Sequence, residues 1–240
     1  MLASQERLER TVTPLSQLGT RWAAVPLAPI VVTLVAVTLV YTVNGGDDTR
    51  IFSKLPTVVY GVANVGTLVA VYLRVSDDVW EAIRAARRPS RSETVAGVLA
   101  TVLGVAVGWR TTTLLSDVLG VSRYTPPAFS STPEAVSVFL VAVVVAPVAE
   151  ELLFRGLLLG ILLERGHTQA TAGVISLLVF GLIHVFTAGV AGVINALLLG
   201  LLLTWLRLRY DSLTGAWLMH FLNNLIEFVV VVGLLPSLYI

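Results

Sequence analysis

The sequence predicts an all-α protein, a multi-pass transmembrane bundle of about seven to eight helices with a polar intramembrane cavity. Composition supports this class, because 56% of the 240 residues are hydrophobic, only 13% are charged, and the mean hydropathy is +0.86. A typical soluble domain carries about 25% charged residues. Apolar segments recur along the chain, and a membrane-spanning helix needs roughly 20 apolar residues. Ionisable side chains inside some of these segments predict the cavity.

Seven apolar segments account for the predicted bundle, and each is bounded by Gly, Pro, Asp or Arg clusters that indicate loops. The segments are residues 23–43, 55–73, 94–109, 134–163, 168–186, 188–206 and 212–235. Residues 111–120 are a candidate partial span, and residues 134–163 are too long for one untilted crossing. Pro147 lies inside that long segment and can kink a helix. The number of crossings is therefore seven or eight.

The distribution of positive charge predicts the orientation of the bundle. With seven crossings and a cytoplasmic N-terminus, eleven arginines fall on the inner side, and the outer side keeps Arg50, Lys54, Arg110 and Arg123. This arrangement is favoured because cytoplasmic loops carry an excess of Lys and Arg. Residues 1–22 are charged and contain no apolar run typical of a cleaved signal. We therefore predict a cell-membrane protein whose cytoplasmic tail comprises residues 1–22.

The rest of the chain divides into two predicted regions. Residues 23–130 form N-terminal transmembrane helices with a charged cytoplasmic linker at 74–93, and residues 131–235 form the catalytic core. In the linker, Val79 and Ile83 share one helical face, as in a short amphipathic helix at the membrane surface. A solvated charged loop is the alternative for this linker.

Composition also limits partners and cofactors. The net charge of +1 provides no basic surface for nucleic acid, so we expect the lipid bilayer and no nucleic acid as a partner. The chain contains no cysteine. Any metal would therefore need His, Asp or Glu ligands.

Polar side chains within apolar segments locate the chemistry in the second half of the chain. Such residues are costly at membrane depth, so they are functional candidates unless they only pair with one another. The first half offers almost none. The second half contains Glu150, Glu151, Arg155, His184, His220, Asn223, Asn224 and Glu227. Asn223 and Glu227 share a helix face, and we expect them either to support the site residues or to form a packing pair.

Spacing assigns different roles to the two adjacent glutamates. Glu151 and Arg155 are four residues apart on one helix face, which favours a structural carboxylate–guanidinium pair. Glu150 is rotated from Glu151 by about 100° around the helix, so its carboxylate can face another neighbour and act as a general base. The alternative is that both acids only neutralise Arg155.

Two histidines lie on the helices that follow. Phe180 and His184 share a helix face, and so do His220 and Asn224, because the members of each pair are four residues apart. A single intramembrane histidine is usually a hydrogen-bonded packing residue. Two histidines and an unmatched glutamate on three neighbouring helices favour a catalytic site.

These residues are compatible with two routes of amide hydrolysis. Two His and one Glu form the ligand set of many zinc sites, in which the metal activates water and polarises a carbonyl. Without a metal, Glu150 would activate water held with His184, and other side chains would stabilise the oxyanion. Those side chains would be His220 and Asn224. The chain lacks HExxH, GxGD and GxSxG motifs, which argues against other intramembrane protease chemistries.

Three motifs in this part of the chain resemble those of a known family. They are EELLFR (Glu150 to Arg155), FGLIH (Phe180 to His184) and HFLNN (His220 to Asn224). They resemble the EExxxR, FxxxH and HxxxN motifs of the CAAX protease and bacteriocin-processing (CPBP) family, also called Abi. Order and separation match as well, over roughly residues 134–226. The N-terminal 130 residues carry none of these motifs.

The resemblance implies transmembrane helices around a cavity reachable from one membrane face, with a glutamate-dependent endopeptidase site. Glu150 would activate water, and His184 would position that water or bind a metal. His220 and Asn224 would stabilise the oxyanion or complete the metal site. The supporting residues would be Glu151, Arg155 and Phe180. Zinc is thus a candidate cofactor at Glu150, His184 and His220.

A membrane-associated peptide or protein is the expected substrate. Eukaryotic members of the family remove the last three residues of prenylated CAAX proteins, but that substrate is not carried over to this chain. An ion-coupled transporter is an alternative, because buried Glu and His also form proton relays, but the inverted repeats it predicts are not visible. A non-catalytic bacteriocin-immunity or binding protein would not need Glu150 and His184, and both are present.

Overall fold

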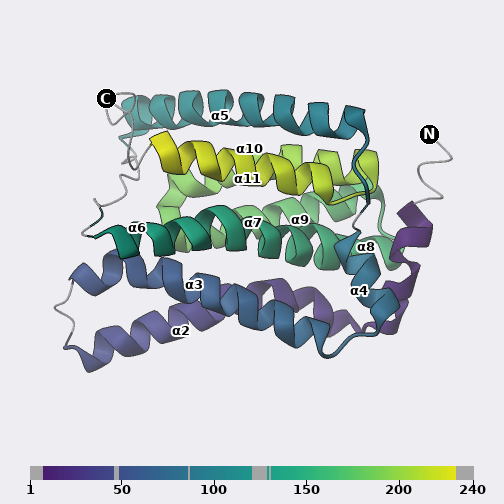
Figure 1. Cartoon of the computed structure of the whole chain (residues 1–240), viewed down its shortest axis with the longest axis horizontal. Helices are drawn as coiled ribbons and strands as arrows, with labels where there is room; N and C mark the ends of the chain where they lie inside the picture. Colours follow the sequence, from purple (N-terminus) through teal and green to yellow (C-terminus); the bar gives the residue numbers. More distant parts are fainter. Residues whose placement is uncertain (1–7, 46–48, 86, 121–128, 130, 231–240) are drawn as a thin grey trace.

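The computed structural model of the chain describes residues 8–45, 49–85, 87–120, 129 and 131–230. Within these ranges the protein is helical and contains no strand, which confirms the all-α class. The long helices run side by side along one axis (Figure 1). This arrangement suits a bundle whose helices cross a bilayer.

Seven long helical segments are present in the described part of the chain. They are η2 (Thr20–Leu27) continuing into α2 (Ala28–Val43), α3 (Thr49–Tyr72), α5 (Arg91–Leu119), the stretch Thr132–Glu164, α9 (Gln169–Ile183), α10 (Val185–Tyr210) and α11 (Thr214–Val229). They lie at the seven predicted segments, although residues 231–235 of the last one are outside the described residues. The candidate partial span at 111–120 continues α5 as far as Leu119 and is not a separate helix.

Five of these segments are long and apolar enough to cross a membrane, and α9 is a shorter apolar helix. Length and composition therefore support a multi-pass membrane protein. The predicted count of seven to eight crossings is not confirmed.

The long stretch Thr132–Glu164 contains two π-helical segments. It comprises α6 (Thr132–Phe139), η3 (Leu140–Val145, π), α7 (Ala146–Glu150), η4 (Glu151–Leu158, π) and α8 (Leu159–Glu164). Pro147 follows the first π segment and does not end the helix. A π turn spaces its backbone hydrogen bonds more widely than an α turn, which accommodates the missing N–H of a proline. The two motif glutamates lie where α7 passes into η4.

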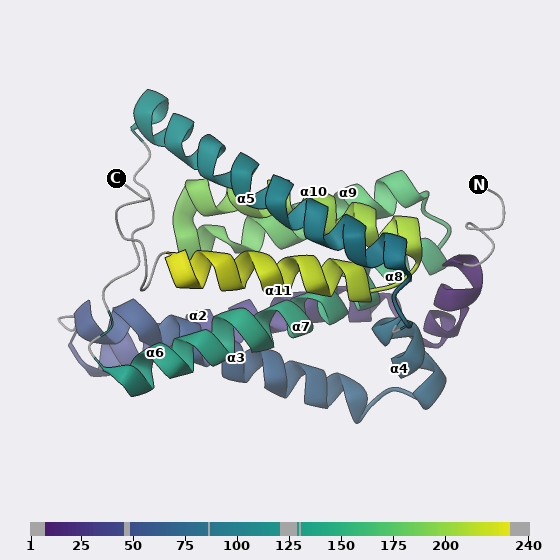
Figure 2. The ribbon, with the colours of Figure 1, turned by 45° about the horizontal axis from the view of Figure 1, so that its top comes forward.

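This stretch occupies the middle of the bundle. It lies between the hairpin of α2 and α3 on one side and the group of α5, α10 and α11 on the other (Figures 1 and 2). Both α3 and α11 contact η3 and α7. Side chains of the central stretch can therefore meet partners from two opposite layers.

The residues expected to form a tail are folded onto the bundle. A helical turn at 8–12 and η1 (Thr13–Gln17) pack against α8 and the linker helix α4 (Asp77–Arg84). The buried apolar side chains of this segment are Leu8, Val12, Leu15 and Leu18. The first three follow the i, i+4, i+7 spacing of one apolar helix face, which a search for long apolar runs does not detect.

The charged linker contains the predicted amphipathic helix, but its apolar face is covered by protein. Val79 and Ile83 of α4 are buried. The backbone of Ile83 approaches Gly156 in η4 so closely that no Cβ fits there. The sequence pattern predicted the amphipathic helix correctly, but expecting this face to lie on the membrane surface was wrong.

Candidate active site

Glu150 is the last residue of α7, and its side chain is buried between two layers of the bundle. Its Oε1 accepts a hydrogen bond of 2.9 Å from the hydroxyl of Tyr60 on α3. Its Oε2 lies 3.7 Å from Nε2 of His220 on α11. The carboxylate is therefore held on one side by α3 and approached on the other by α11.

Glu151 orients His220 and pairs with Arg155. The Nδ1 atom of His220 lies 2.9 Å from Glu151 Oε1, and Arg155 Nη1 donates to the same oxygen at 3.2 Å. An ionised carboxylate can only accept, so Nδ1 of His220 carries the hydrogen and Nε2 faces Glu150. The structure brings Glu151 and Arg155 together in the predicted pair, and that pair also holds His220.

Phe180 packs at the centre of these polar groups. The guanidinium carbon of Arg155 lies 4.0 Å from the centroid of the Phe180 ring. The centroid of the Phe180 ring lies 4.8 Å from that of the His184 ring and 6.0 Å from that of the His220 ring. Arg155 Nη2 also donates to the carbonyl of Gly200 on α10, at 3.4 Å. Phe180 thus packs against Arg155 and against the rings of both histidines.

His184 follows the last residue of α9, and the chain reverses at Gly189, near the start of α10. The reversal places Gly189 at φ 62° and ψ −159°, a conformation that only glycine adopts readily. Nδ1 of His184 lies 2.7 Å from the carbonyl oxygen of Phe180. A carbonyl only accepts, so Nδ1 carries the hydrogen and the neutral ring has an unprotonated Nε2. That atom suits a hydrogen bond from water.

A small cavity connects Glu150 with His184. Its volume is about 20 Å³, and its lining residues are Ile30, Tyr60, Glu150, Ile183 and His184. Such a volume holds about one water molecule. The predicted general base and the predicted water-positioning histidine thus share a space of the size that a nucleophilic water needs.

Asn224 makes a bond that the sequence did not predict. Its Nδ2 donates to the carbonyl of Ala142 in η3 at 2.9 Å. An amide NH₂ group has two hydrogens, so this bond uses one of them. Asn224 and His220 are not among the residues that line the small cavity. Asn223 donates to Glu227 at 3.3 Å, as expected for a packing pair.

The residues do not form a metal site in this arrangement. Among the described residues, no three His, Asp or Glu side chains are placed to hold a metal ion. Nδ1 of His220 is bonded to Glu151 and Nδ1 of His184 to the Phe180 carbonyl, so Nε2 of each ring is the atom that would bind a metal. Zinc binding at Glu150, His184 and His220 stays a prediction.

Tyr60 is the site residue that the sequence analysis missed. It lies in the half of the chain that we expected to contribute almost no polar groups. Asn64, one turn further along α3, is fully buried and donates to the Tyr60 carbonyl at 3.0 Å. Tyrosine and asparagine four residues apart in an apolar segment indicate a polar helix face, and this signal was available in the sequence.

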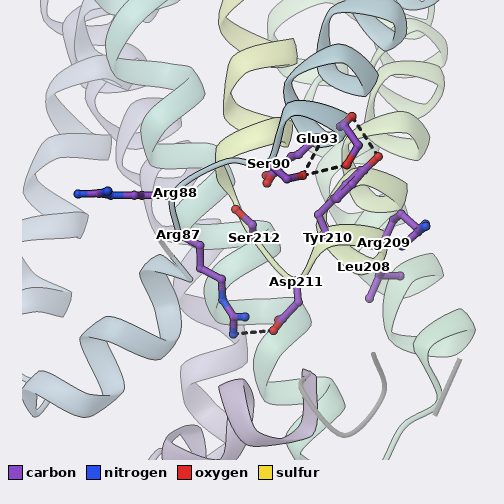
Figure 3. A pocket seen from close by; sticks show the side chains of 10 residues that line it. Arg87, Arg88, Ser90, Glu93, Leu208, Arg209, Tyr210, Asp211 and Ser212 are labelled. Carbon is purple, nitrogen blue, oxygen red and sulfur yellow. Dashed lines mark hydrogen bonds and ion pairs between the residues drawn. The ribbon is translucent and has the colours of Figure 1, made fainter. Parts of the chain in front are cut away.

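A larger cavity of about 280 Å³ lies away from these residues, where the start of α5 meets the end of α10. Arg87 pairs with Asp211 at 2.7 Å, and Asp211 pairs with the buried Arg207 at 2.9 Å. Arg88 and Arg209 point away from each other (Figure 3). Because its charges are paired or diverge, this cavity presents no convergent set of groups to a ligand.

Comparison with known proteins supports the family resemblance. A family model described as type II CAAX prenyl endopeptidase Rce1-like matches residues 132–226. The matched segment contains all three motifs, so the resemblance is confirmed over the region that carries them. Comparisons with curated proteins and with solved structures give no match. Tyr60 lies outside the matched segment.

Proposed function

The chain carries an Rce1-like segment at residues 132–226, and from this premise we propose that it is an intramembrane endopeptidase. One observation carries the proposal. Glu150 and His184 line a cavity for one water molecule, and His220 lies 3.7 Å from the Glu150 carboxylate. A general base must lie within hydrogen-bonding reach of the proton it removes.

In the proposed reaction, the water in this cavity attacks the carbonyl carbon of a peptide bond. Glu150 accepts a proton from the water as the new C–O bond forms. The second O–H of the water donates a hydrogen bond to Nε2 of His184. The proton then passes from Glu150 to the leaving nitrogen as the C–N bond breaks. Water and peptide bond thus become a carboxyl group and an amine, and Glu150 is regenerated.

His220 and Asn224 are proposed to stabilise the oxyanion of the tetrahedral intermediate. His220 lies between two carboxylates, with Glu150 at 3.7 Å and Glu151 at 2.9 Å. In the proposed step, a hydrogen on Nε2 of His220 is donated to the developing negative charge. The second amide hydrogen of Asn224 is the other proposed donor.

The proposed substrate is a membrane-associated protein or peptide. A prenylated CAAX-type protein is the first candidate, because the matched family consists of CAAX prenyl endopeptidases. We also propose that the protein resides in the cell membrane with its N-terminus in the cytoplasm, since this orientation places most arginines inside.

The test uses purified protein in phospholipid vesicles with a farnesylated CAAX peptide and the same peptide without its prenyl group. Wild type should release the C-terminal tripeptide, detected by mass spectrometry, and Glu150→Ala should abolish that release. Glu164→Ala in α8 is the control, because Glu164 pairs with Arg165, away from the cavity. Undiminished cleavage by Glu150→Ala would overturn the mechanism. No cleavage by wild type would favour a non-catalytic binding protein.

A further inference from the structure

We infer that Tyr60 is a positioning residue that orients the Glu150 carboxylate for water activation, an inference that rests on the proposed function. Tyr60 lies on α3, in the hairpin layer beside α7 (Figure 2). It is outside residues 132–226, so the family match assigns it no role. Its hydroxyl contacts Glu150 and its side chain lines the water-sized cavity.

Glu150 needs an external partner to fix the plane of its carboxylate. The terminal torsion of a glutamate side chain has a broad energy minimum, so packing of the chain alone leaves the two oxygens free to rotate. A hydrogen bond of 2.9 Å from Tyr60 fixes Oε1, and Oε2 then faces His220 at 3.7 Å. With both oxygens placed, one edge of the carboxylate is presented to the cavity that it shares with His184.

The position of Tyr60 is itself held by the packing of α3. Gly61 lies against Val141 of η3, where an added Cβ would come within 2.6 Å of both Cγ atoms of that valine. Asn64 donates its amide to the Tyr60 carbonyl at 3.0 Å. The Gly61 contact brings α3 close to the central stretch and limits the displacement of the Tyr60 hydroxyl relative to Glu150, whereas the Asn64 bond lies within α3.

Tyr60 acts through Glu150 and transfers no proton of its own. In the hydrolytic step, the proton of water goes to Glu150 and then to the leaving nitrogen, while the phenol keeps its hydrogen. A different role would be a latch, in which the Tyr60 bond keeps α3 closed over the cavity. The two roles predict opposite effects of removing the hydroxyl, because a positioning residue promotes catalysis and a latch restrains it.

The experiment measures kcat and KM for cleavage of a farnesylated CAAX peptide in vesicles. Tyr60→Phe should lower kcat about 10- to 100-fold with little change in KM, since a hydrogen bond to a charged group is lost. Tyr60→Leu should lower kcat by a similar factor, because the hydroxyl is the group that matters. Tyr72→Phe is the matched control, since it removes a hydroxyl from an exposed side chain on the same helix, and it should behave as wild type.

Several results would overturn the inference. If Tyr60→Phe matched wild type while Tyr60→Leu lost activity, the ring would serve packing alone. Faster cleavage by Tyr60→Phe would identify a latch, and a rise in KM at constant kcat would identify a substrate contact. Cleavage that depends on Glu150 and not on Tyr60 would leave the proposed function intact and refute only this inference. A wild type that does not cleave would refute both.

Discussion

Helix α2 and the central stretch Thr132–Glu164 are both long apolar helices, yet they differ in what covers them. Within Thr20–Val43, the apolar segment that ends with α2, about 22% of the 18-residue window used to identify a membrane span is buried inside the protein. The corresponding share within Thr132–Glu164 is 39%. Side chains such as Val31, Val35 and Leu39 of α2 face outward. Hydropathy alone does not separate a lipid-facing helix from a central one.

Buried polar side chains distinguish the central stretch from the lipid-facing helix α2, whereas hydropathy does not. The central stretch contains Glu150, Glu151 and Arg155, all buried and all bonded to other helices. In the hairpin of α2 and α3, Tyr60 and Asn64 are the residues that join this network. The hairpin therefore contributes to the site through Ile30 of α2 and one short polar face of α3, and most of its surface is available to lipid.

The largest expected effect in this comparison comes from the buried ion pair. Arg155→Ala leaves Glu151 buried without its cation, which should destabilise the fold by about 3–5 kcal/mol. The matched substitution Arg84→Ala removes a partner of Glu81 in an exposed pair, where the expected loss is about 0–1 kcal/mol. Thermal unfolding of purified protein in detergent measures both. Equal stability of the two variants would contradict the assigned difference between buried and exposed pairs.

A smaller effect is expected from one glycine in the central stretch and one in α3. Gly156→Ala places a Cβ against the Ile83 backbone, which should cost about 1–3 kcal/mol because α4 must move. Gly66→Ala in α3 meets no atom within 4 Å and should be neutral or stabilise the helix by up to about 1 kcal/mol. The melting temperature of Gly156→Ala should fall, and that of Gly66→Ala should stay unchanged or rise. A tolerated Gly156→Ala would mean that α4 packs more loosely than the structure shows.

The smallest expected effect is that of metal removal. In the metal-free route, Glu150 and His184 hold the water by themselves in the small cavity, so cleavage should persist after dialysis against a chelator. Elemental analysis of the active protein provides the second measurement. Loss of activity that added zinc restores would favour the metal route at Glu150, His184 and His220.

Local patterns in the sequence predicted the parts of this protein that depend on neighbouring residues. The apolar segments predicted the helices, and the four-residue spacing predicted the Glu151–Arg155 pair, because both follow from helix geometry. The π segments around Pro147 were not predicted. Ala142 in the first of them accepts a hydrogen bond from Asn224 on α11, a contact between distant segments that no local pattern predicts.

Contacts between distant segments were less accessible to sequence reasoning. Tyr60 meets Glu150 across 90 positions of the chain, and no local pattern states that α3 packs beside α7. His220 similarly reaches Glu151 across 69 positions, and the sequence did not predict a histidine between two carboxylates. The buried segment at residues 8–18 was missed for a different reason, because its apolar face is short and interrupted by charges.

Glutamate-dependent water activation is tested most directly by cleavage with the isosteric variant Glu150→Gln. The amide keeps an oxygen that can accept the Tyr60 hydrogen bond, so the melting temperature should stay close to that of wild type. It cannot serve as the general base, so cleavage of the farnesylated peptide should fall at least about 100-fold. Cleavage by Glu150→Gln within a factor of about two of wild type, at equal stability, would contradict general-base catalysis by Glu150.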